Sequence, residues 1–228
     1  MKIFLEREGI SISCTTSHKY MNTELGLCSI TRRKRKQGVS GNCHKKFDNI
    51  LQRDFTSEQP NLKWCVDFTY LFLQNGNKRY NCTIIDLFDR SVVASATGKE
   101  ITADLAKKAL AKAMKDNPKA SKNGLILHSD QGSQFTSNEF IRACEGYGIR
   151  QSMSRAGCPY DNAPMERYFN TLKNELIYHY TYTSDEKLNA AISDFTYVWY
   201  NHARPHSYNG GLTPAQKRKS SVYAAKAA

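Results

Sequence analysis

A short apolar run that ends in an acidic residue places the tightest constraint on how this chain can fold. Residues 125–127 (Leu-Ile-Leu) follow Gly124 and predict a short buried strand. His128, Ser129 and Asp130 come directly after this strand. Because open α/β sheets bind their ligands at the carboxyl ends of strands, we expect Asp130 to lie at a ligand-binding edge.

A second carboxylate, Glu166, lies near the start of a helix predicted over residues 162–180. Asp161 or Asn162 can cap this helix. Pro164 falls in the first turn, where its missing N–H costs little. The pattern therefore places Glu166 on the first or second turn of a rigid element.

A third carboxylate, Asp67, lies far upstream within an alternating run, residues 64–72, that predicts a strand. An acidic side chain between Val66 and Phe68 is costly to bury unless it has a partner. Three carboxylates on rigid elements with apolar neighbours predict a metal site, and their oxygens suit Mg²⁺ or Mn²⁺ better than Zn²⁺.

The charge of such a site indicates its chemistry. Carboxylates alone repel the phosphates of DNA, whereas two divalent ions attract them and clamp the attacking and leaving oxygens of a displacement at phosphorus. Lys173 lies seven residues after Glu166, so it projects from the same face of the predicted helix two turns further on.

Each acidic residue also has an ordinary interpretation. Asp130 could cap the helix that follows its strand, and Glu166 could simply favour the amino end of its helix. Asp86 and Asp89 lie at the end of a second predicted strand and in the turn after it, where a turn or supporting role is favoured over metal ligation.

The remaining pattern predicts an α/β fold. An antiparallel meander is expected over residues 64–72, 79–87 and 91–97, with an Asn75-Gly76 turn. Further strands are expected from Leu125 and over residues 149–153. Further helices are expected over residues 102–115 with Thr102 as the cap, over residues 137–147, and over residues 184–201, the last burying Leu188, Ile192, Phe195, Val198 and Trp199.

Residues 1–57 differ in composition and predict a partial helical DNA-binding segment, with residues 58–220 as the catalytic core and 221–228 as a tail. A short helix over residues 20–27 ends at Gly26, and Pro60 is a plausible hinge. The run from Thr31 to Lys46 contains seven Lys or Arg residues and no acidic residue, which favours phosphate contact.

The formal net charge of +12 points to an anionic partner, and no apolar run is long enough to span a membrane. Glu6, Arg7 and Glu8 interrupt the start in a way that is wrong for a signal peptide, so a cytoplasmic, nucleoid-associated protein is expected. The seven cysteines favour reduced thiols. A zinc site has no standard ligand spacing, although Cys14, His18, Cys28, Cys43 and His44 could contribute.

Several motifs together carry a family resemblance. Thirty-five residues separate Asp130 from Glu166, and Asp67 lies upstream. This resembles the Asp, Asp-35-Glu signature of retroviral-integrase-like transposases. The runs Trp-Cys-Val-Asp-Phe-Thr-Tyr (64–70), His-Ser-Asp-Gln-Gly-Ser-Gln-Phe (128–135), Gln-Ser-Met-Ser-Arg (151–155), Tyr-Asp-Asn-Ala-Pro-Met-Glu-Arg (160–167) and Tyr-Asn-His-Ala-Arg-Pro-His (200–206) resemble the second-frame (OrfB) subunit of bacterial insertion sequences of the IS-three family.

The resemblance covers about residues 20–216 and implies an RNase H-like five-stranded mixed sheet flanked by helices, preceded by a small basic helical segment. It implies a polynucleotidyl transferase that cuts element ends and joins the freed 3′-hydroxyl to target DNA. Asp67, Asp130 and Glu166 would hold Mg²⁺ or Mn²⁺, and Lys173 would contact DNA near the terminal base pairs. Arg155, Asn162 and Arg204 would contact the DNA backbone or support the site.

The resemblance also implies partners. A homo-oligomer of at least two copies is expected, because two DNA ends must be brought together. Relatives carry a longer helical region before the core, so a first-frame (OrfA) subunit or fusion is expected to recognise the ends. Two other functions remain open: a DNA-binding protein without catalysis, and a related nuclease acting on RNA–DNA hybrids or junctions.

Overall fold

The computed structural model describes residues 1–27, 45–120 and 124–227, and the chain divides into two compact units, Met1–Gln37 and Gly38–Ala228. The predicted basic run over residues 31–46 lies outside the described residues except for Lys45 and Lys46, which are exposed. Among the described helices, none combines the length and the apolar character that crossing a membrane requires.

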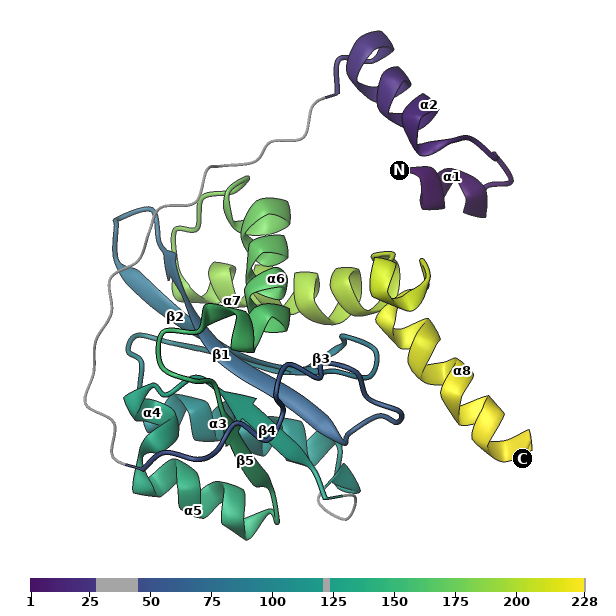
Figure 1. Ribbon diagram of the computed structural model, residues 1–228. Helices are drawn as coiled ribbons and strands as arrows, with labels where there is room; N and C mark the ends of the chain where they lie inside the picture. Colours follow the sequence, from purple (N-terminus) through teal and green to yellow (C-terminus); the bar gives the residue numbers. More distant parts are fainter. Residues whose placement is uncertain (28–44, 121–123, 228) are drawn as a thin grey trace. The chain divides into compact units, whose positions relative to one another are not determined.

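The first unit consists of short helical pieces, drawn in purple in Figure 1: α1 (Lys2–Arg7), α2 (Cys14–Lys19) and the wider turn η1 (Tyr20–Glu24). Ser13 caps α2 by accepting a hydrogen bond from the amide of Thr16 at 2.9 Å. The predicted helix is therefore present but begins at Cys14, and Gly26, at φ +62°, follows its end.

The zinc alternative gains no support from this unit. Cys28, Cys43 and His44 lie outside the described residues, whereas Cys14 is exposed and the His18 ring contacts the Asn22 amide at 2.9 Å. No group of three His, Cys, Asp or Glu side chains in the described ranges is arranged to hold a metal ion.

The second unit is built on a five-stranded sheet in the order β3-β2-β1-β4-β5 (Figure 1). Its strands are β1 (Lys63–Phe72), β2 (Lys78–Asp86), β3 (Val92–Gly98), β4 (Ile126–Ser129) and β5 (Arg150–Met153). The first three pair antiparallel, whereas β4 pairs parallel with β1 and with β5. This confirms the predicted meander and the mixed sheet.

Helices cover both faces of the sheet because side chains alternate along β1. Trp64 and Val66 pack with α3 (Ala103–Asp116), α4 (Ser133–Thr136) and α5 (Asn138–Gly146) in one core. Cys65 packs in a second core with Met165 and other residues of α6 (Ala163–Leu172). The predicted cap Thr102 accepts a hydrogen bond from a first-turn amide, and Ser137 and Ser184, at the predicted starts of two other helices, do the same.

The chain then continues through a mostly helical region. Its elements are η3 (Pro159–Asn162), η4 (Lys173–Ile177), α7 (Asp185–Asp194), η5 (Phe195–Ala203), η6 (Ser207–Asn209) and α8 (Pro214–Ala227). The expected burial of Val198 and Trp199 is wrong, since they are 59% and 39% exposed. The wider π-type turns of η5 rotate these positions off the face that buries Phe195 and Tyr200.

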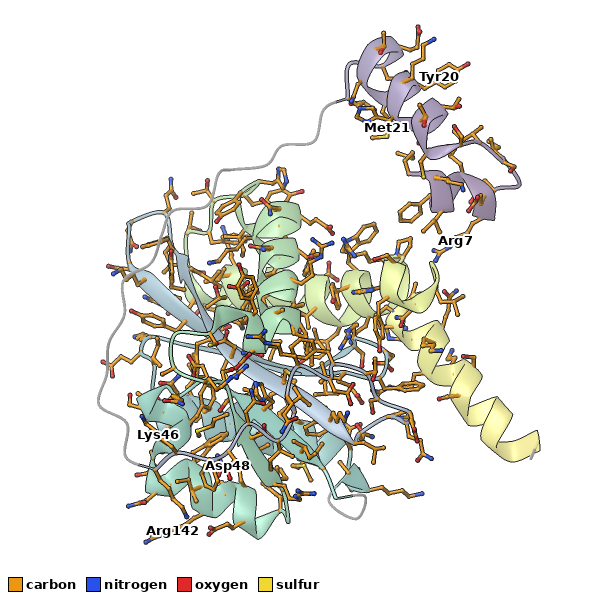
Figure 2. The ribbon with its side chains drawn as sticks, viewed as in Figure 1. Arg7, Tyr20, Met21, Lys46, Asp48 and Arg142 are labelled. Carbon is orange, nitrogen blue, oxygen red and sulfur yellow. The ribbon has the colours of Figure 1, made fainter. Side chains whose placement is uncertain are left out.

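The segment before β1 packs on the core rather than standing apart from it. Leu51 is buried in the second core, and the amide of Met153 donates to the carbonyl oxygen of Asp48 at 3.3 Å. Figure 2 labels Lys46 and Asp48 where this segment begins to cross the core. The compact units divide at residues 37 and 38, before the predicted limit at residue 57, and the predicted limit at residue 220 falls within α8.

A buried ion cluster fastens α8 to the turn after β2. Arg218 donates from Nη2 to Asp86 and from Nε to Asp89, each at 2.5 Å, and both carboxylates are fully buried. Asp86 also accepts the amide of Phe88, and Asp89 accepts the amide of Ser91. The two acids therefore have the turn role that the sequence favoured, and Arg218 is not part of the free cationic surface.

Replacing Arg218 by methionine is expected to destabilise the protein by about 3 kcal/mol, because two buried carboxylates lose their counter-ion. Urea unfolding followed by circular dichroism measures the change. Lys219→Met is the matched control, because Lys219 is exposed on the same helix, and it should leave the free energy of unfolding within about 0.5 kcal/mol. Equal stabilities for the two variants would contradict this role of the cluster.

Candidate active site

The sheet brings Asp67 and Asp130 to the same level on neighbouring strands. In the parallel pairing of β1 with β4, Cys65 lies opposite His128, and the two aspartates each follow two residues later. The pairing of β4 covers only residues 63–65 of β1. Asp67 therefore lies where β1 has lost its neighbour on that side, at the carboxyl end of β4, which is the edge the sequence predicted.

Glu166 is provided by a helix and not by the sheet. It lies on the first turn of α6 and is exposed. Helix α6 packs against β1 through Met165, which is fully buried in the same core as Cys65. Phe169 and Leu172 are buried together with Met165, so these three residues form the apolar face of the helix. The amino end of the helix favours a carboxylate at this position.

Electrostatics connect the three carboxylates. Burial, followed by the negative charges of Asp130 and Glu166, raises the pKa of Asp67 to about 8. The amide of Phe68, which donates to Asp67 Oδ1 at 2.7 Å, and the charge of Lys173 act in the opposite direction. Asp67 thus lies within the fields of both other acids.

Asp130 has a defined local geometry. Its Oδ1 accepts the amide of Gly132 at 2.9 Å, and burial raises its pKa above the ordinary aspartate value. Gly132 is the N-cap of α4 and has no side-chain cap bond, so Asp130 does not cap that helix through a first-turn amide. The simple capping interpretation is wrong.

Lys173 lies near Asp67, in agreement with the prediction that it projects from the same helix face as Glu166. Its Nζ lies 4.4 Å from the centre of the Tyr70 ring, at cation–π distance. Burial lowers the pKa of Lys173, and the charge of Asp67 raises it. A partly desolvated cation therefore stands beside the carboxylates, where it has an aromatic ring as a neighbour.

Asn162 is buried, with 6% of its surface exposed. Its Nδ2 donates to the carbonyl oxygen of Val66 at 3.5 Å, and its Oδ1 has no hydrogen-bond partner. Asn162 is the N-cap residue of α6, as expected, but its side chain makes no cap hydrogen bond. Its position between α6 and the residue before Asp67 favours support of the site over contact with a DNA backbone.

The two predicted arginines are held by carboxylates outside the set of three. Arg155 is exposed and places its Nε 3.3 Å from Asp161. Arg204 forms a forked pair with Glu175, with Nη2–Oε1 at 2.7 Å and Nε–Oε1 at 2.9 Å. Asp161 was expected as a helix cap, but it accepts hydrogen bonds from Arg155 and Arg53 instead.

Sequence reasoning missed a buried polar network between β4 and the end of β5. The buried ring of His128 contacts Ser152 Oγ at 2.9 Å and Ser154 Oγ at 3.1 Å, so it joins β4 to β5. Burial lowers the pKa of His128 to about 4, which keeps the ring neutral at physiological pH. The only available signal was a histidine at a strand end beside Asp130.

A surface hollow lies between the amino ends of α3 and α5. It is lined by residues 102–104 and 137–139, and Thr102 and Ser137 already cap the two helices there. Asp104 and Glu139 occupy the first turns. None of the predicted site residues lines this hollow, so its shape does not compete with the carboxylate region.

Two models of the integrase core domain match the chain, over residues 57–159 and 147–214. Solved structures share the fold. The HTLV-2 integrase catalytic core domain in complex with magnesium is 23% identical with a TM-score of 0.56, covering 71% of this chain and 98% of that one. The Mos1 transposase catalytic domain is 15% identical with a TM-score of 0.52, covering 60% and 72%. The fold is that of RNase H-like integrase and transposase cores.

Curated relatives define the family more closely. The putative transposase InsK for insertion element IS150 of Escherichia coli K12 is 34% identical over 94% of this chain and 74% of its own length. The transposase InsF for insertion sequence IS3A of the same strain is 35% identical over 80% and 67%. An IS600 31 kDa protein of Shigella sonnei is 37% identical, and the match spans 62% of its length. The chain belongs to the IS3 family of DDE transposases, as its motifs implied.

Asp67→Asn is expected to stabilise the metal-free protein at pH 8. Because folding raises the pKa of Asp67 from about 4 to about 8, folding disfavours the ionised form, and metal-free stability falls as the pH rises through this window. Each pKa unit is worth about 1.4 kcal/mol, so removing this charge should add on the order of 5 kcal/mol at pH 8.

The measurement is urea unfolding in a chelating buffer at pH 5 and pH 8. The gain of Asp67→Asn over the wild type should be larger at pH 8. Asp116→Asn is the control, since Asp116 is exposed at the end of α3. A gain of the same size at both pH values would show that Asp67 is not held in a charge-disfavouring environment.

Proposed function

We propose that this chain cuts DNA at the ends of an insertion sequence and joins the freed 3′-hydroxyl to target DNA. In this proposal Asp67, Asp130 and Glu166 hold two Mg²⁺ ions, for which Mn²⁺ can substitute. The observation that supports it most is the parallel register of β1 and β4, which brings Asp67 and Asp130 to the same level at the carboxyl end of β4. Excess negative charge on hard oxygen ligands is what a divalent cation neutralises.

The donor set fits the ions in chemistry, because all three ligands are hard carboxylate oxygens, although the three side chains are not gathered as a metal-binding group in the described ranges. Asp67 and Asp130 follow paired strand residues, and Glu166 lies on the helix packed across β1. Asn162 Nδ2 contacts the carbonyl oxygen next to Asp67, which supports the orientation of that strand residue. Metal binding would draw the three carboxylates together, because it replaces their mutual repulsion by attraction to a shared charge.

When bound, the ions would activate the attacking oxygen and stabilise the leaving oxygen at phosphorus. The protein's own residues do the positioning. Asp130 is oriented by the Gly132 amide, and Asp67 by the Phe68 amide. Lys173 would contact a phosphate near the terminal base pairs, with Tyr70 fixing the direction of its side chain.

Other DNA contacts and partners belong to the same proposal. Arg155 and Arg204 would reach the DNA backbone by exchanging their present carboxylate partners for phosphates, and Asn162 would support the site. The substrates are element ends and target DNA, so the chain would work in the cytoplasm on the nucleoid. A homo-oligomer is proposed by analogy with the simian T-cell lymphotropic virus intasome, a structural neighbour with a TM-score of 0.59. A first-frame (OrfA) subunit or fusion would recognise the ends.

Asp130→Asn is expected to lower Mg²⁺-dependent cleavage and joining of element-end DNA by about a thousandfold or more. Loss of one ligand removes several kcal/mol of transition-state stabilisation, and each 1.4 kcal/mol is tenfold in rate. Labelled element ends, supplied with a first-frame partner, provide the assay. Asp116→Asn is the matched control.

Each alternative function has its own outcome in this assay. Wild-type protein that binds ends but never cuts them in Mg²⁺ or Mn²⁺ would favour a DNA-binding protein without catalysis. Efficient cutting of RNA–DNA hybrids in place of duplex ends would favour a related nuclease. Full activity in correctly folded Asp130→Asn protein would remove the carboxylate site from the mechanism.

Lys173→Met is expected to weaken end binding and to reduce the slope of log affinity against log salt by about 0.9, the value for one lost phosphate contact. Fluorescence anisotropy over a range of KCl concentrations measures the slope. Lys115→Met, which removes an exposed lysine of α3, is the control. An unchanged slope in Lys173→Met would show that Lys173 does not contact a phosphate.

A further inference from the structure

A buried carboxylate outside the proposed ligand set has an unusually complete set of donors. The side chain of Asp161 is 0% exposed. It accepts hydrogen bonds from Asn49 Nδ2 at 3.1 Å, from Arg53 Nε at 2.6 Å, and from Arg155 through its amide at 3.0 Å and its Nε at 3.3 Å. These donors come from two segments more than a hundred residues apart.

The donors keep Asp161 ionised despite its burial. The hydrogen bond from the Arg155 amide, together with those from Arg53 and from the Arg155 side chain, lowers the pKa of Asp161 well below its ordinary value. A buried charge is tolerated only when it is paired and hydrogen-bonded in this way. The cluster of Asp161, Asn49, Arg53 and Arg155, which we call the joint, therefore stays ionised and hydrogen-bonded at neutral pH.

One side of this joint is the segment over residues 48–53, which we call the strap. Its Asp48 carbonyl accepts the Met153 amide, and its amides at Ile50 and Leu51 donate to Ser152 Oγ at 3.0 and 3.2 Å. The strap therefore runs along β5, the edge strand of the sheet. An edge strand has unpaired backbone groups that such a segment satisfies.

The strap adopts a costly backbone conformation where it meets Asp161. Gln52 and Arg53 have φ values of +47° and +64°, in the left-handed region that side chains other than glycine disfavour. The Gln52 amide is held by Asn49 Oδ1 at 2.8 Å. Two consecutive strained residues persist only where their surroundings hold them, and here they direct Arg53 to Asp161.

The other side of the joint leads to two of the three proposed ligands. Asp161 lies two residues before α6 and five before Glu166, and Asn162 connects the same turn to β1 beside Asp67. A second branch starts at Ser152, which contacts the strap and also the His128 ring, two residues before Asp130.

We propose that the strap is a working part of the catalytic core and that Asp161 is its positioning residue. By holding Arg53, Asn49 and the loop that starts at Arg155, Asp161 fixes the start of α6 and so the approach of Glu166 to Asp67 and Asp130. This inference rests on the proposed function of the three carboxylates. It assigns the strap, which directly follows the basic segment, the task of setting the geometry of the metal ligands.

The test uses the full chain with Asp161→Asn and Arg53→Met, assayed on labelled element ends. Loss of an outer partner of a metal ligand typically costs 10–100-fold. We expect the kcat in Mg²⁺ to fall by about this factor, with KM for DNA changed less than about twofold. Mg²⁺ demands near-ideal octahedral geometry, so activity in Mn²⁺ should fall less than activity in Mg²⁺.

A second readout does not depend on activity. Mn²⁺ binding to the DNA-free protein, followed by electron paramagnetic resonance, should weaken by about tenfold or more in both variants. Arg53→Lys, which keeps a cation near Asp161, should recover part of the loss. Lys107→Met is the matched control, because it removes a surface ion pair with Glu139 between α3 and α5 and should change neither readout.

The outcomes separate this inference from the proposed function. If Asp130→Asn abolishes activity while Asp161→Asn and Arg53→Met keep wild-type Mg²⁺ activity and Mn²⁺ affinity, the positioning role is refuted and the proposed function stands. If Asp130→Asn stays active, the proposed function fails first. Should Asp161→Asn not fold, Arg53→Met and Arg53→Lys decide the question, since the Arg53 side chain is 46% exposed.

Discussion

Repulsion among the carboxylates is the constraint around which this protein is arranged. Asp67 and Asp130 both have raised pKa values because burial disfavours their charge, and for Asp67 the charges of Asp130 and Glu166 add to this effect. A fold that only maximised stability would not place three acids in one another's fields. Each acid lies on or directly after a separately stabilised element. The electrostatic repulsion therefore destabilises the site locally, while the packing of the core stays intact.

The mixed pairing of β1 makes this arrangement possible. On one side β1 pairs along its whole length with β2, which anchors it in the meander. On the other side β4 pairs only with the first three residues of β1. Beyond that point the backbone is held from one side and open on the other. Asp67 is thus fixed by a rigid strand, and its half-buried residue lies where β1 has no neighbouring strand on that side.

Much of this could be predicted from local sequence. Alternation identified β1, an apolar run identified β4, and helical spacing identified α6, so the placement of the carboxylates on these elements followed from patterns within about ten residues. The cap at Thr102 was equally local. Assigning the three acids as ligands needed the family motifs in addition, because each acid alone has an ordinary interpretation.

What the sequence could not reveal depends on partners distant along the chain. Asp161 looked like a helix cap, because capping is the commonest local use of an acid before a helix, whereas its actual donors include Arg53, more than a hundred residues upstream. Arg218 has no local signal of burial in its Lys-Arg-Lys run, yet it neutralises two buried acids far upstream. Val198 and Trp199 were misplaced because π-type turns shift the burial period, which a spacing of 3.6 residues cannot anticipate.

The net charge of +12 is distributed in a way that this chemistry requires. Several arginines are already used inside the fold, against Asp86, Asp89, Asp161 and Glu175. These pairs hold α8, the strap and η5 in place, so the remaining excess charge must come from other residues, among them exposed lysines such as Lys45, Lys46 and Lys115. A diffuse lysine field attracts DNA without specifying its register, since it is screened beyond roughly 10 Å. Register must then come from short-range contacts, and Lys173, which lies over the Tyr70 ring and within the field of Asp67, is a cation held near the proposed ligands.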